Sequence, residues 1–356
     1  MTERILRVGL VGYGLGGRVF HAPLIAAEPR MELTAIVTRD PERSARARED
    51  FPDAAILASV DDLLARAGSL DLVVVTTTNR VHVPIGLAVL DAGLGLVMDK
   101  PLAPTSIDGA HLLERARERG LPFSVFQNRR FDGDFRTIER LLGDGRLGRV
   151  VRFESRYERW RPTPREHAWR ESGEAEDAGG LLFDLGSHLI DQALHLFGRP
   201  SSVYAEIHRR RTGVVVDDDT FVALTHRGGE VSHLWMNVLA AIPGPRFRVL
   251  GTAATYEKDG MDVQEAALNA GGRPGDAGWG IEPESAWGRI SGGDGIEAVP
   301  TEPGAYDAYY AAIAGAIIDG LHLPVDPLDS VVGLEIIEAA FRSAREGRVV
   351  PFPAGS

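Results

Sequence analysis

The chain has 356 residues, a formal net charge of −12 and no cysteine. Its length predicts two domains that each bury a core. The acidic balance argues against nucleic-acid binding and against a basic membrane-binding surface, and the lack of cysteine excludes disulfides and thiolate chemistry. The sequence contains no signal-peptide pattern and no apolar stretch near the ~20 residues of a membrane span. We therefore expect a cytoplasmic protein.

Residues 1–125 alternate short apolar runs with helical patterns, which is typical of βαβ units. The apolar runs predict buried parallel strands at 5–14, 31–38, 70–78, 94–100 and 121–128. The helical patterns fall at 17–28, 40–51, 60–68, 82–93 and 107–120. We predict a doubly wound parallel sheet of the Rossmann type in an NAD(P)-binding domain.

Residues 126–356 follow a different pattern, in which longer alternating strands are separated by Gly/Asp turns. Strands are expected at 148–160, 200–210, 219–226, 230–239 and 245–258, with helices at 186–198, 305–320 and 330–347. Residues 269–295 are Gly-rich, and we expect an irregular segment that Trp279 and Trp287 help to order. This half is predicted to be a substrate-binding and dimerisation domain with an open, mainly antiparallel sheet.

Lysine is almost absent from this chain. Of the 39 basic residues only Lys100 and Lys258 are lysine, so 39 − 2 = 37 are arginine. Lys100, in "LVMDKPLAPT", directly follows an apolar run, and a compact ammonium with a tunable pKa does what arginine cannot. We interpret Lys100 as a functional residue. Lys258, in the turn-like "EKDG", is typical of a lysine that persists by chance on a loop.

The first predicted strand ends in a GxGxxG pattern that opens a helix, formed by Gly12, Tyr13, Gly14, Leu15, Gly16 and Gly17. In this context glycines permit a tight turn, close approach of a pyrophosphate to the backbone, and helix–strand packing. The phosphates would then meet backbone N–H groups at a helix N-terminus. The alternative is a Gly-rich turn that binds no nucleotide.

The end of the second predicted strand indicates which dinucleotide binds. NAD-selective sites usually place an acid there for the ribose 2′-hydroxyl, whereas this chain has Thr38 and Arg39. Asp40 is explained as the N-cap of the next helix, before Pro41. Arg39, with Arg43 as a second candidate, favours NADP, although NAD remains open if Arg39 only faces solvent.

Four polar residues fall on one predicted helical face, at Asp184, His188, Asp191 and His195. A carboxylate one turn from an imidazole suits general acid–base chemistry. The alternatives are an N-cap at Asp184, a solvated surface, or a metal site. Because Gly179, Gly180 and Gly186 allow a close approach to the backbone, a plain surface is disfavoured.

Taken together, the GxGxxG turn, "TTTNRVH", "DKP" and "GGLLFDLGSHLID" resemble the Gfo/Idh/MocA family of NAD(P)-dependent oxidoreductases over nearly the whole chain. "GYGLGGRVFHAPLI", "FQNRRFDGDF", "WRE" and "PRFRVLGT" are similar to the branch that contains NADP-dependent scyllo-inositol dehydrogenases. The resemblance implies reversible hydride transfer between a cyclic polyol or sugar and NADP. It also implies a homodimer or homotetramer, paired through the open sheet.

The resemblance further implies a set of site residues. Lys100, Asp184 and His188 correspond to the catalytic positions, with Lys100 also beside the nicotinamide. Asp99 departs from the family's usual glutamate, so its contacts are an open question. The residues that the resemblance and the glycine motif together assign to the cofactor are Gly12, Tyr13, Gly14, Leu15, Gly17, Thr38, Arg39, Thr77, Asn79, His82, Lys100 and Asn128, with Arg129 near the nicotinamide or substrate.

In the mechanism that this predicts, His188 is the base, Asp184 orients it or a substrate hydroxyl, and Lys100 stabilises the alkoxide without any metal. Three alternatives stay open. The first is a non-catalytic sugar- or nucleotide-sensing regulator on the same fold. The second is a reductase of a sugar-derived dicarbonyl. The third is a metal-dependent lyase or isomerase that uses Asp184, His188 and Asp191.

Overall fold

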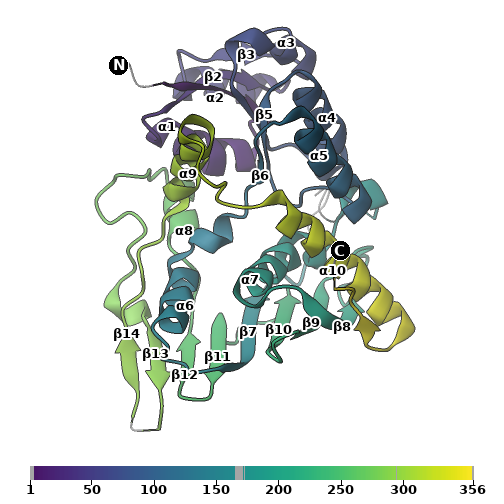
Figure 1. Cartoon of the computed structure of the whole chain (residues 1–356), viewed down its shortest axis with the longest axis vertical. Helices are drawn as coiled ribbons and strands as arrows, with labels where there is room; N and C mark the ends of the chain where they lie inside the picture. The colour runs from purple at the N-terminus through teal and green to yellow at the C-terminus, as the bar shows by residue number, and fades with distance from the viewer. Residues whose placement is uncertain (1–3, 165–170, 172, 294, 355–356) are drawn as a thin grey trace.

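The computed structural model describes residues 4–164, 171, 173–293 and 295–354. Trp169 and Arg170 of the "WRE" motif lie outside these ranges. Two β-sheets form the framework, one above the other, with helices between them (Figure 1). No helix in the described ranges is both long enough and apolar enough to cross a membrane.

The first sheet is the predicted doubly wound one, with six parallel strands in the order β3-β2-β1-β4-β5-β6. Its strands are β1 (Leu6–Val11), β2 (Met31–Val37), β3 (Ala55–Leu57), β4 (Leu72–Val75), β5 (Gly95–Met98) and β6 (Phe123–Val125). Its helices are α1 (Ala22–Ala27), α2 (Pro41–Asp50), α3 (Val60–Leu64), α4 (His82–Asp91) and α5 (Ser106–Arg119). The strand order reverses between β1 and β4, which is where open α/β sheets bind ligands.

Helix α9 (Tyr306–Asp319) belongs by sequence to the second half of the chain but packs on the first sheet. Its residues Tyr309, Tyr310 and Ile313 lie in the same buried cluster as Leu10 of β1 and Leu24 of α1. Figure 1 shows α9 beside α1 at the upper end of the molecule. The apolar residues on one face of the Rossmann sheet are therefore covered partly by a helix from the end of the chain.

The second sheet has nine strands in the order β14-β13-β12-β11-β7-β10-β9-β8-β15. They are β7 (Val150–Glu158), β8 (Pro200–His208), β9 (Asp219–His226), β10 (Val231–Asn237), β11 (Phe247–Gly251), β12 (Thr255–Lys258), β13 (Gly288–Ser291), β14 (Glu297–Val299) and β15 (Val350–Pro351). The described pairings are antiparallel except that of β7 with β10. An open, mainly antiparallel sheet is thus confirmed.

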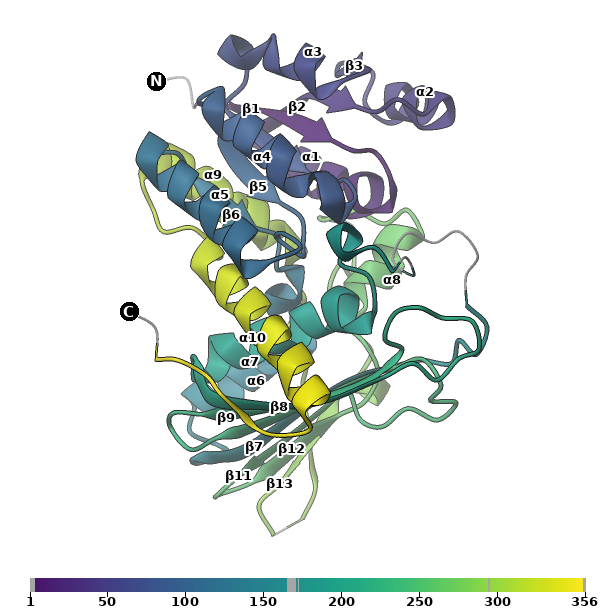
Figure 2. The same cartoon turned by 90° about the vertical axis from the view of Figure 1, so that its right-hand side faces the viewer.

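Helices cover one face of the second sheet, the face toward the Rossmann sheet (Figure 2). These are α6 (Gly133–Gly143), α7 (Ser187–Phe197) and α10 (Pro327–Glu346), while α8 (Gln264–Asn269) lies nearer to the first sheet. Helix α10 packs closely on α5 where Gly109 leaves room, since a Cβ there would lie 3.3 Å from Leu334. No described helix covers the opposite face, where Phe221 and Trp235 are half-buried. The expected subunit pairing through that face stays a prediction.

Several elements differ from the expectations. The predicted strand at 245–258 is two strands, β11 and β12, because the chain turns back at Gly251, whose N–H donates to the carbonyl of Ala254 (2.9 Å). The segment 269–295 contains β13, and the indole of Trp279 donates to Asp307 on α9 (3.0 Å). The elements β3, α6, α8, β14 and β15 were not expected. All except α6 are short, and local periodicity carries little information there. Helix α6 has apolar residues at helical spacing, at Phe135, Ile138 and Leu141, and this pattern was missed.

The expectation for Lys258 is wrong. This side chain is only 1% exposed, its ammonium lies 3.2 Å from the buried carboxylate of Glu282, and it donates to the carbonyl of Asp259 (2.7 Å). A buried cation needs a partner of opposite charge and satisfied hydrogen bonds. Lys258 is therefore part of a buried ion pair that ties β12 to the segment before β13.

Removing this lysine is expected to destabilise the fold strongly. Lys258→Ala leaves Glu282 buried without its counter-charge, and breaking a buried ion pair from one side typically costs about 3–5 kcal/mol. Urea unfolding of the wild type and the variant measures the difference in the free energy of unfolding. The double variant Lys258→Met/Glu282→Leu should recover most of the loss, because neither charge then remains.

The matched control is the exposed pair that Arg289 of β13 makes with Glu257 of β12 (2.8 Å). Arg289→Ala should cost less than about 1 kcal/mol, as solvent-exposed ion pairs do. If Lys258→Ala were as mild as Arg289→Ala, the buried pair would not be needed for stability.

Candidate functional site

The glycines of the turn after β1 are needed for different reasons. Gly12 has a φ of +101°, and a Cβ there would lie 2.9 Å from the carbonyl oxygen of Thr76. A Cβ on Gly17 would collide with the carbonyl oxygen of Gly12 at 2.0 Å. Around Gly14 there is open space, and the nearest group is the guanidinium of Arg43 at 3.7 Å. Protein packing thus explains Gly12 and Gly17, whereas Gly14 leaves the backbone accessible to a ligand.

The surroundings of this turn fit a dinucleotide. The hydroxyl of Thr77, after β4, is buried and has no hydrogen-bond partner in the described structure. Leu15 is exposed at the tip of the turn. Tyr13, by contrast, is buried, and its hydroxyl donates to Asp50 (2.7 Å). Only the backbone of Tyr13 is available to a cofactor.

Two arginines flank the end of β2. Asp40 caps α2, since its carboxylate accepts from the backbone N–H of Arg43 (2.9 Å), as expected. Arg39 is exposed and Thr38 is half-buried. Within the described part of the chain neither Arg39 nor Arg43 has an acidic side chain at ion-pair distance. Both guanidiniums remain available for an anionic group.

Three other predicted cofactor residues are buried and serve the protein framework. The amide of Asn79 donates to the carbonyl of Asp177 (2.8 Å). The ring of His82 lies between the carbonyl oxygens of Pro101 (3.0 Å) and Thr77 (3.2 Å), so it holds the turn after Lys100 against the turn after β4. Asn128 is buried in a 3-10 turn at Asn128–Phe131.

Lys100 follows β5 and reaches across to the second half of the chain. Its ammonium donates to the main-chain oxygen of Asp184 (2.6 Å) and to its carboxylate (3.0 Å). The side chain is largely buried. The two residues that the sequence singled out, 84 positions apart, therefore meet in space.

Asp99, in place of the family's glutamate, turns back on its own loop. Its carboxylate accepts from the backbone N–H of Lys100 (2.8 Å) and lies 3.8 Å from the ring of His21. Burial acts to raise the pKa of Asp99, but the nearby imidazole of His21 and the charge of Lys100 outweigh it and lower the pKa. The shorter side chain thus keeps a negative charge between Lys100 and the glycine-rich turn.

His188 lies in α7, directly after a π-helical turn (Leu182–Gly186) that contains Asp184. A π-helical turn changes the angular spacing of side chains, so the four-residue spacing no longer keeps Asp184 and His188 on one face. The Nδ1 atom of His188 is buried without a hydrogen-bond partner in the described structure. No hydrogen bond links Asp184 to Nδ1, so no contact at this atom supports Asp184 as the group that orients the ring. Its other expected role, orienting a substrate hydroxyl, stays a prediction.

The other two residues of the predicted face point elsewhere. Asp191 is buried in a bidentate pair with Arg130 (2.7 and 2.8 Å), and His195 pairs with Glu139 of α6 (2.9 Å). The buried carboxylate of Asp217 approaches the backbone at Gly180, where a Cβ would lie 1.9 Å from it. The glycines here accommodate the protein itself. Among the residues that the structure describes, no cluster of acidic and histidine side chains is arranged to hold a metal.

The sequence analysis missed a group of side chains around Tyr157 that lies next to His188. The ring of Tyr157, on β7, is buried, with guanidinium carbons 5.7 Å from its centre for Arg129 and Arg159 and 4.5 Å for Arg246. The ring of His188 lies 6.5 Å from the same centre. The hydroxyl of Tyr157 has no described partner, and burial raises its pKa to about 12.

Glu265, on α8, belongs to the same group of side chains. Its carboxylate accepts a short hydrogen bond from Arg129. Burial acts to raise the pKa of Glu265, but the charges of Arg129, Arg159 and Lys100 lower it. Its bond to Arg129, which faces the ring of Tyr157, places Glu265 next to that ring. Local sequence patterns give no signal for it.

The fold and these contacts define a class, that of oxidoreductases which use a nicotinamide dinucleotide. Residues 6–127 match the model of an oxidoreductase family with an NAD-binding Rossmann fold, and residues 139–352 match that of the same family's C-terminal alpha/beta domain. The chain belongs to the Gfo/Idh/MocA oxidoreductase family. It is an NAD(P)-dependent enzyme that acts on CH–OH groups.

Known proteins align over nearly the whole chain. It is 36% identical to scyllo-inositol 2-dehydrogenase (NADP(+)) IolW of Bacillus subtilis (strain 168), over 97% of this chain and 95% of the relative. It is 37% identical to the uncharacterized oxidoreductase YdgJ of Escherichia coli (strain K12), over 97% and 98% of the two chains. The solved structure of yvaA from Bacillus subtilis superposes with a TM-score of 0.92 at 34% identity, over 99% of this chain and 100% of that one.

The environment of His188 generates a prediction. Burial, followed by the positive charges of Lys100, Arg129, Arg246 and Arg159, lowers the pKa of His188 well below its usual value. We expect the ring to be neutral at pH 6.5, where a free histidine is half protonated. Lys100→Met removes one of the cations and should raise this pKa.

The measurement is an NMR titration of the imidazole signals, with His188→Asn used to assign the signal. A wild-type His188 that titrates at or above pH 6.5, or one that titrates identically in Lys100→Met, would contradict the electrostatic description of the site.

Proposed function

We propose that the protein transfers a hydride reversibly between a secondary hydroxyl of a cyclic polyol or sugar, of the inositol type, and NADP. The observation that carries this proposal is the Lys100–Asp184 contact beside a neutral, buried His188. The NADP-dependent scyllo-inositol dehydrogenase among its relatives supports the substrate class and the cofactor.

NADP, when bound, supplies the nicotinamide that accepts or returns the hydride. Gly14 with the exposed turn would hold the pyrophosphate, Thr77 would offer its unpartnered hydroxyl, and Arg39 and Arg43 would contact the 2′-phosphate. Lys100 lies just beyond the C-terminal end of β5, which is the edge where sheets of this type bind ligands. The residues present therefore fit the dinucleotide.

The protein's own groups handle the proton and the developing charge. Oxidation of CH–OH requires loss of the hydroxyl proton as the hydride leaves, and neutral His188 accepts that proton. Lys100 places a compact positive charge at the alkoxide oxygen. Asp184 acts through Lys100, since its carboxylate and main-chain oxygen fix the ammonium at two points. In the reductive direction the same groups return the proton to the product.

The cofactor proposal predicts that NADP(H) binds more tightly than NAD(H). Arg39→Ala removes a charge-assisted contact to the 2′-phosphate, which typically costs about 1.5–3 kcal/mol, roughly tenfold to a hundredfold in affinity. NAD(H) affinity should not change. Fluorescence titration of both reduced cofactors measures this, with Arg48→Ala as the control, since Arg48 is an exposed arginine on helix α2, which begins two residues after Arg39. Equal affinities in the wild type would refute the selectivity.

The catalytic proposal is tested by following NADPH absorbance with a panel of inositols, sugars and their ketones, in both directions. Lys100→Arg should lower kcat by roughly 10²–10³, because a planar guanidinium cannot place a point charge at one oxygen. Thermal unfolding and NADPH binding should stay close to wild type. A fully active variant would show that Lys100 is not catalytic, and a wild type without turnover on any polyol or ketone would favour the regulator hypothesis.

A further inference from the structure

We infer that Arg159, as a hydrogen-bond donor, and Glu265, as an acceptor, bind two vicinal hydroxyl groups of a neutral ring substrate, away from the reacting carbon. This inference rests on the proposed function and names its substrate more closely. It makes Arg159 and Glu265 specificity-determining residues beside Tyr157 and Arg129.

The position of Arg159 is fixed by the backbone. It directly follows β7, its N–H donates to the carbonyl of Asn237 at the end of β10 (2.9 Å), and its carbonyl accepts from Ala240 (3.1 Å). The guanidinium lies 5.7 Å from the centre of the Tyr157 ring, the same ring that adjoins His188. Arg159 is therefore held at the site by the sheet.

The guanidinium of Arg159 is half-buried but has no ion-pair partner. Within the described residues no carboxylate lies at ion-pair distance from it. It lies beside the same Tyr157 ring as Arg129, which bonds to Glu265, and its charge contributes to lowering the pKa of both His188 and Glu265. A partly desolvated guanidinium with five N–H donors and no carboxylate partner is suited to bind oxygen atoms of a ligand.

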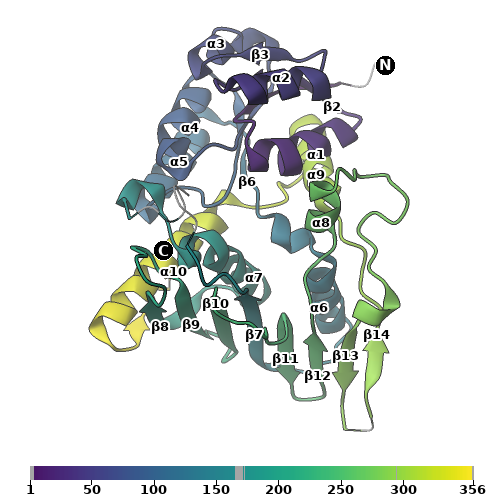
Figure 3. The same ribbon diagram turned by 180° about the vertical axis from the view of Figure 1, so that it is seen from behind.

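Glu265 supplies the complementary acceptor. One carboxylate oxygen is bonded to Arg129, and the other has no hydrogen bond to a described residue. The side chain is 36% exposed. Its helix is anchored by the neighbouring Gln264, which donates to the carbonyl of Phe131 (3.1 Å) and accepts from the N–H of Tyr306 (2.7 Å). Figure 3 shows α8 below α1 and α9, at the Rossmann side of the molecule.

Arg159 and Glu265 would select a substrate because one offers hydrogen-bond donors and the other an acceptor. No ion pair joins Arg159 and Glu265 in the described structure, and Arg129, which bonds to Glu265, faces the same Tyr157 ring as Arg159. We place the ligand at the unbonded ends of the two side chains. A hydroxyl group both accepts and donates, so one hydroxyl of a vicinal diol accepts from Arg159 while its neighbour donates to Glu265. A carboxylate in place of the second hydroxyl would be repelled by Glu265 and could not donate to it, which favours a neutral polyol over an anionic sugar acid.

The experiment compares three probes: scyllo-inositol, cyclohexanol, which has a reacting hydroxyl and no others, and glucuronate as an anionic ring. Calorimetry measures their binding to the enzyme–NADPH complex, and kcat/KM is measured for those that react. Arg159→Gln and Glu265→Gln should each weaken scyllo-inositol binding by about tenfold to a hundredfold. Cyclohexanol and NADPH binding should change less than about threefold, since no hydroxyl contact is lost.

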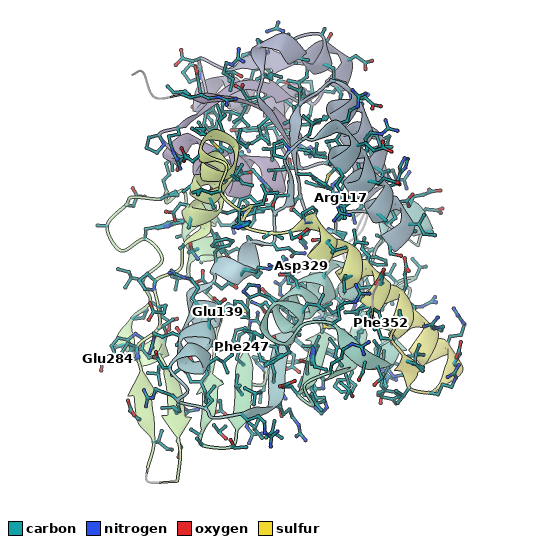
Figure 4. The ribbon with its side chains drawn as sticks, viewed as in Figure 1. Arg117, Glu139, Phe247, Glu284, Asp329 and Phe352 are labelled. Atoms are coloured by element: carbon teal, nitrogen blue, oxygen red, sulfur yellow. The ribbon has the colours of Figure 1, made fainter. Side chains whose placement is uncertain are left out.

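The controls are Arg117→Gln on α5 and Glu284→Gln beside β13, which are both exposed and lie on opposite sides of the molecule (Figure 4). They should leave all constants unchanged. In the kinetics, KM for the polyol should rise more than kcat falls, which a merely structural role would not produce.

The outcomes separate this inference from the proposed function. Binding of scyllo-inositol that depends on Arg159, without turnover, would keep the inference and contradict the dehydrogenase proposal. Turnover of scyllo-inositol with equal losses for cyclohexanol in the variants would keep the dehydrogenase and overturn the inference. A wild type that binds glucuronate more tightly than scyllo-inositol, or binds no scyllo-inositol, would also overturn it.

Discussion

The contact between Lys100 and Asp184 is the interaction on which the site depends. The lysine lies two residues after the fifth strand of the Rossmann sheet, and the aspartate lies in the π-helical turn that leads into α7 of the second half. One ammonium therefore joins the two parts of the molecule at the point where the chemistry is proposed. Because it binds both the main-chain oxygen and the carboxylate of Asp184, its position follows the backbone of the second half as well as the side chain.

The charges around this contact are arranged so that the base is neutral and the cations stay charged. Four basic side chains surround His188, while the carboxylates of the site are engaged with Lys100 and Arg129. A protonated imidazole would be repelled from this environment, so the ring begins the oxidative reaction able to take a proton. Asp99 turns back toward its own loop, where its carboxylate accepts from the backbone N–H of Lys100. It therefore adds a negative charge near Lys100 without contacting the ammonium.

The sequence predicted the parts of this structure that are local. The glycine-rich turn, the Asp40 cap and the doubly wound sheet follow from patterns within a few residues. Lys100 and Asp184 were found because an unusual lysine and a family motif marked them. Arg159, Tyr157 and Glu265 carry no such mark, and their proximity results from strand order and from the placement of α8. Lys258 was misjudged for the same reason, since its partner Glu282 is 24 positions away and lies beside it only in the folded chain.

The placement of α9 has a consequence for how the molecule is made. Its tyrosines complete a core whose other members are mostly contributed by the first hundred residues. During synthesis the Rossmann half therefore leaves the ribosome with an apolar face exposed to solvent. Helix α9 can cover this face only after residue 319 has been added. The two halves of this enzyme thus share one buried core, and a gene fragment that ends after the sixth strand would encode a domain that lacks the tyrosines of α9.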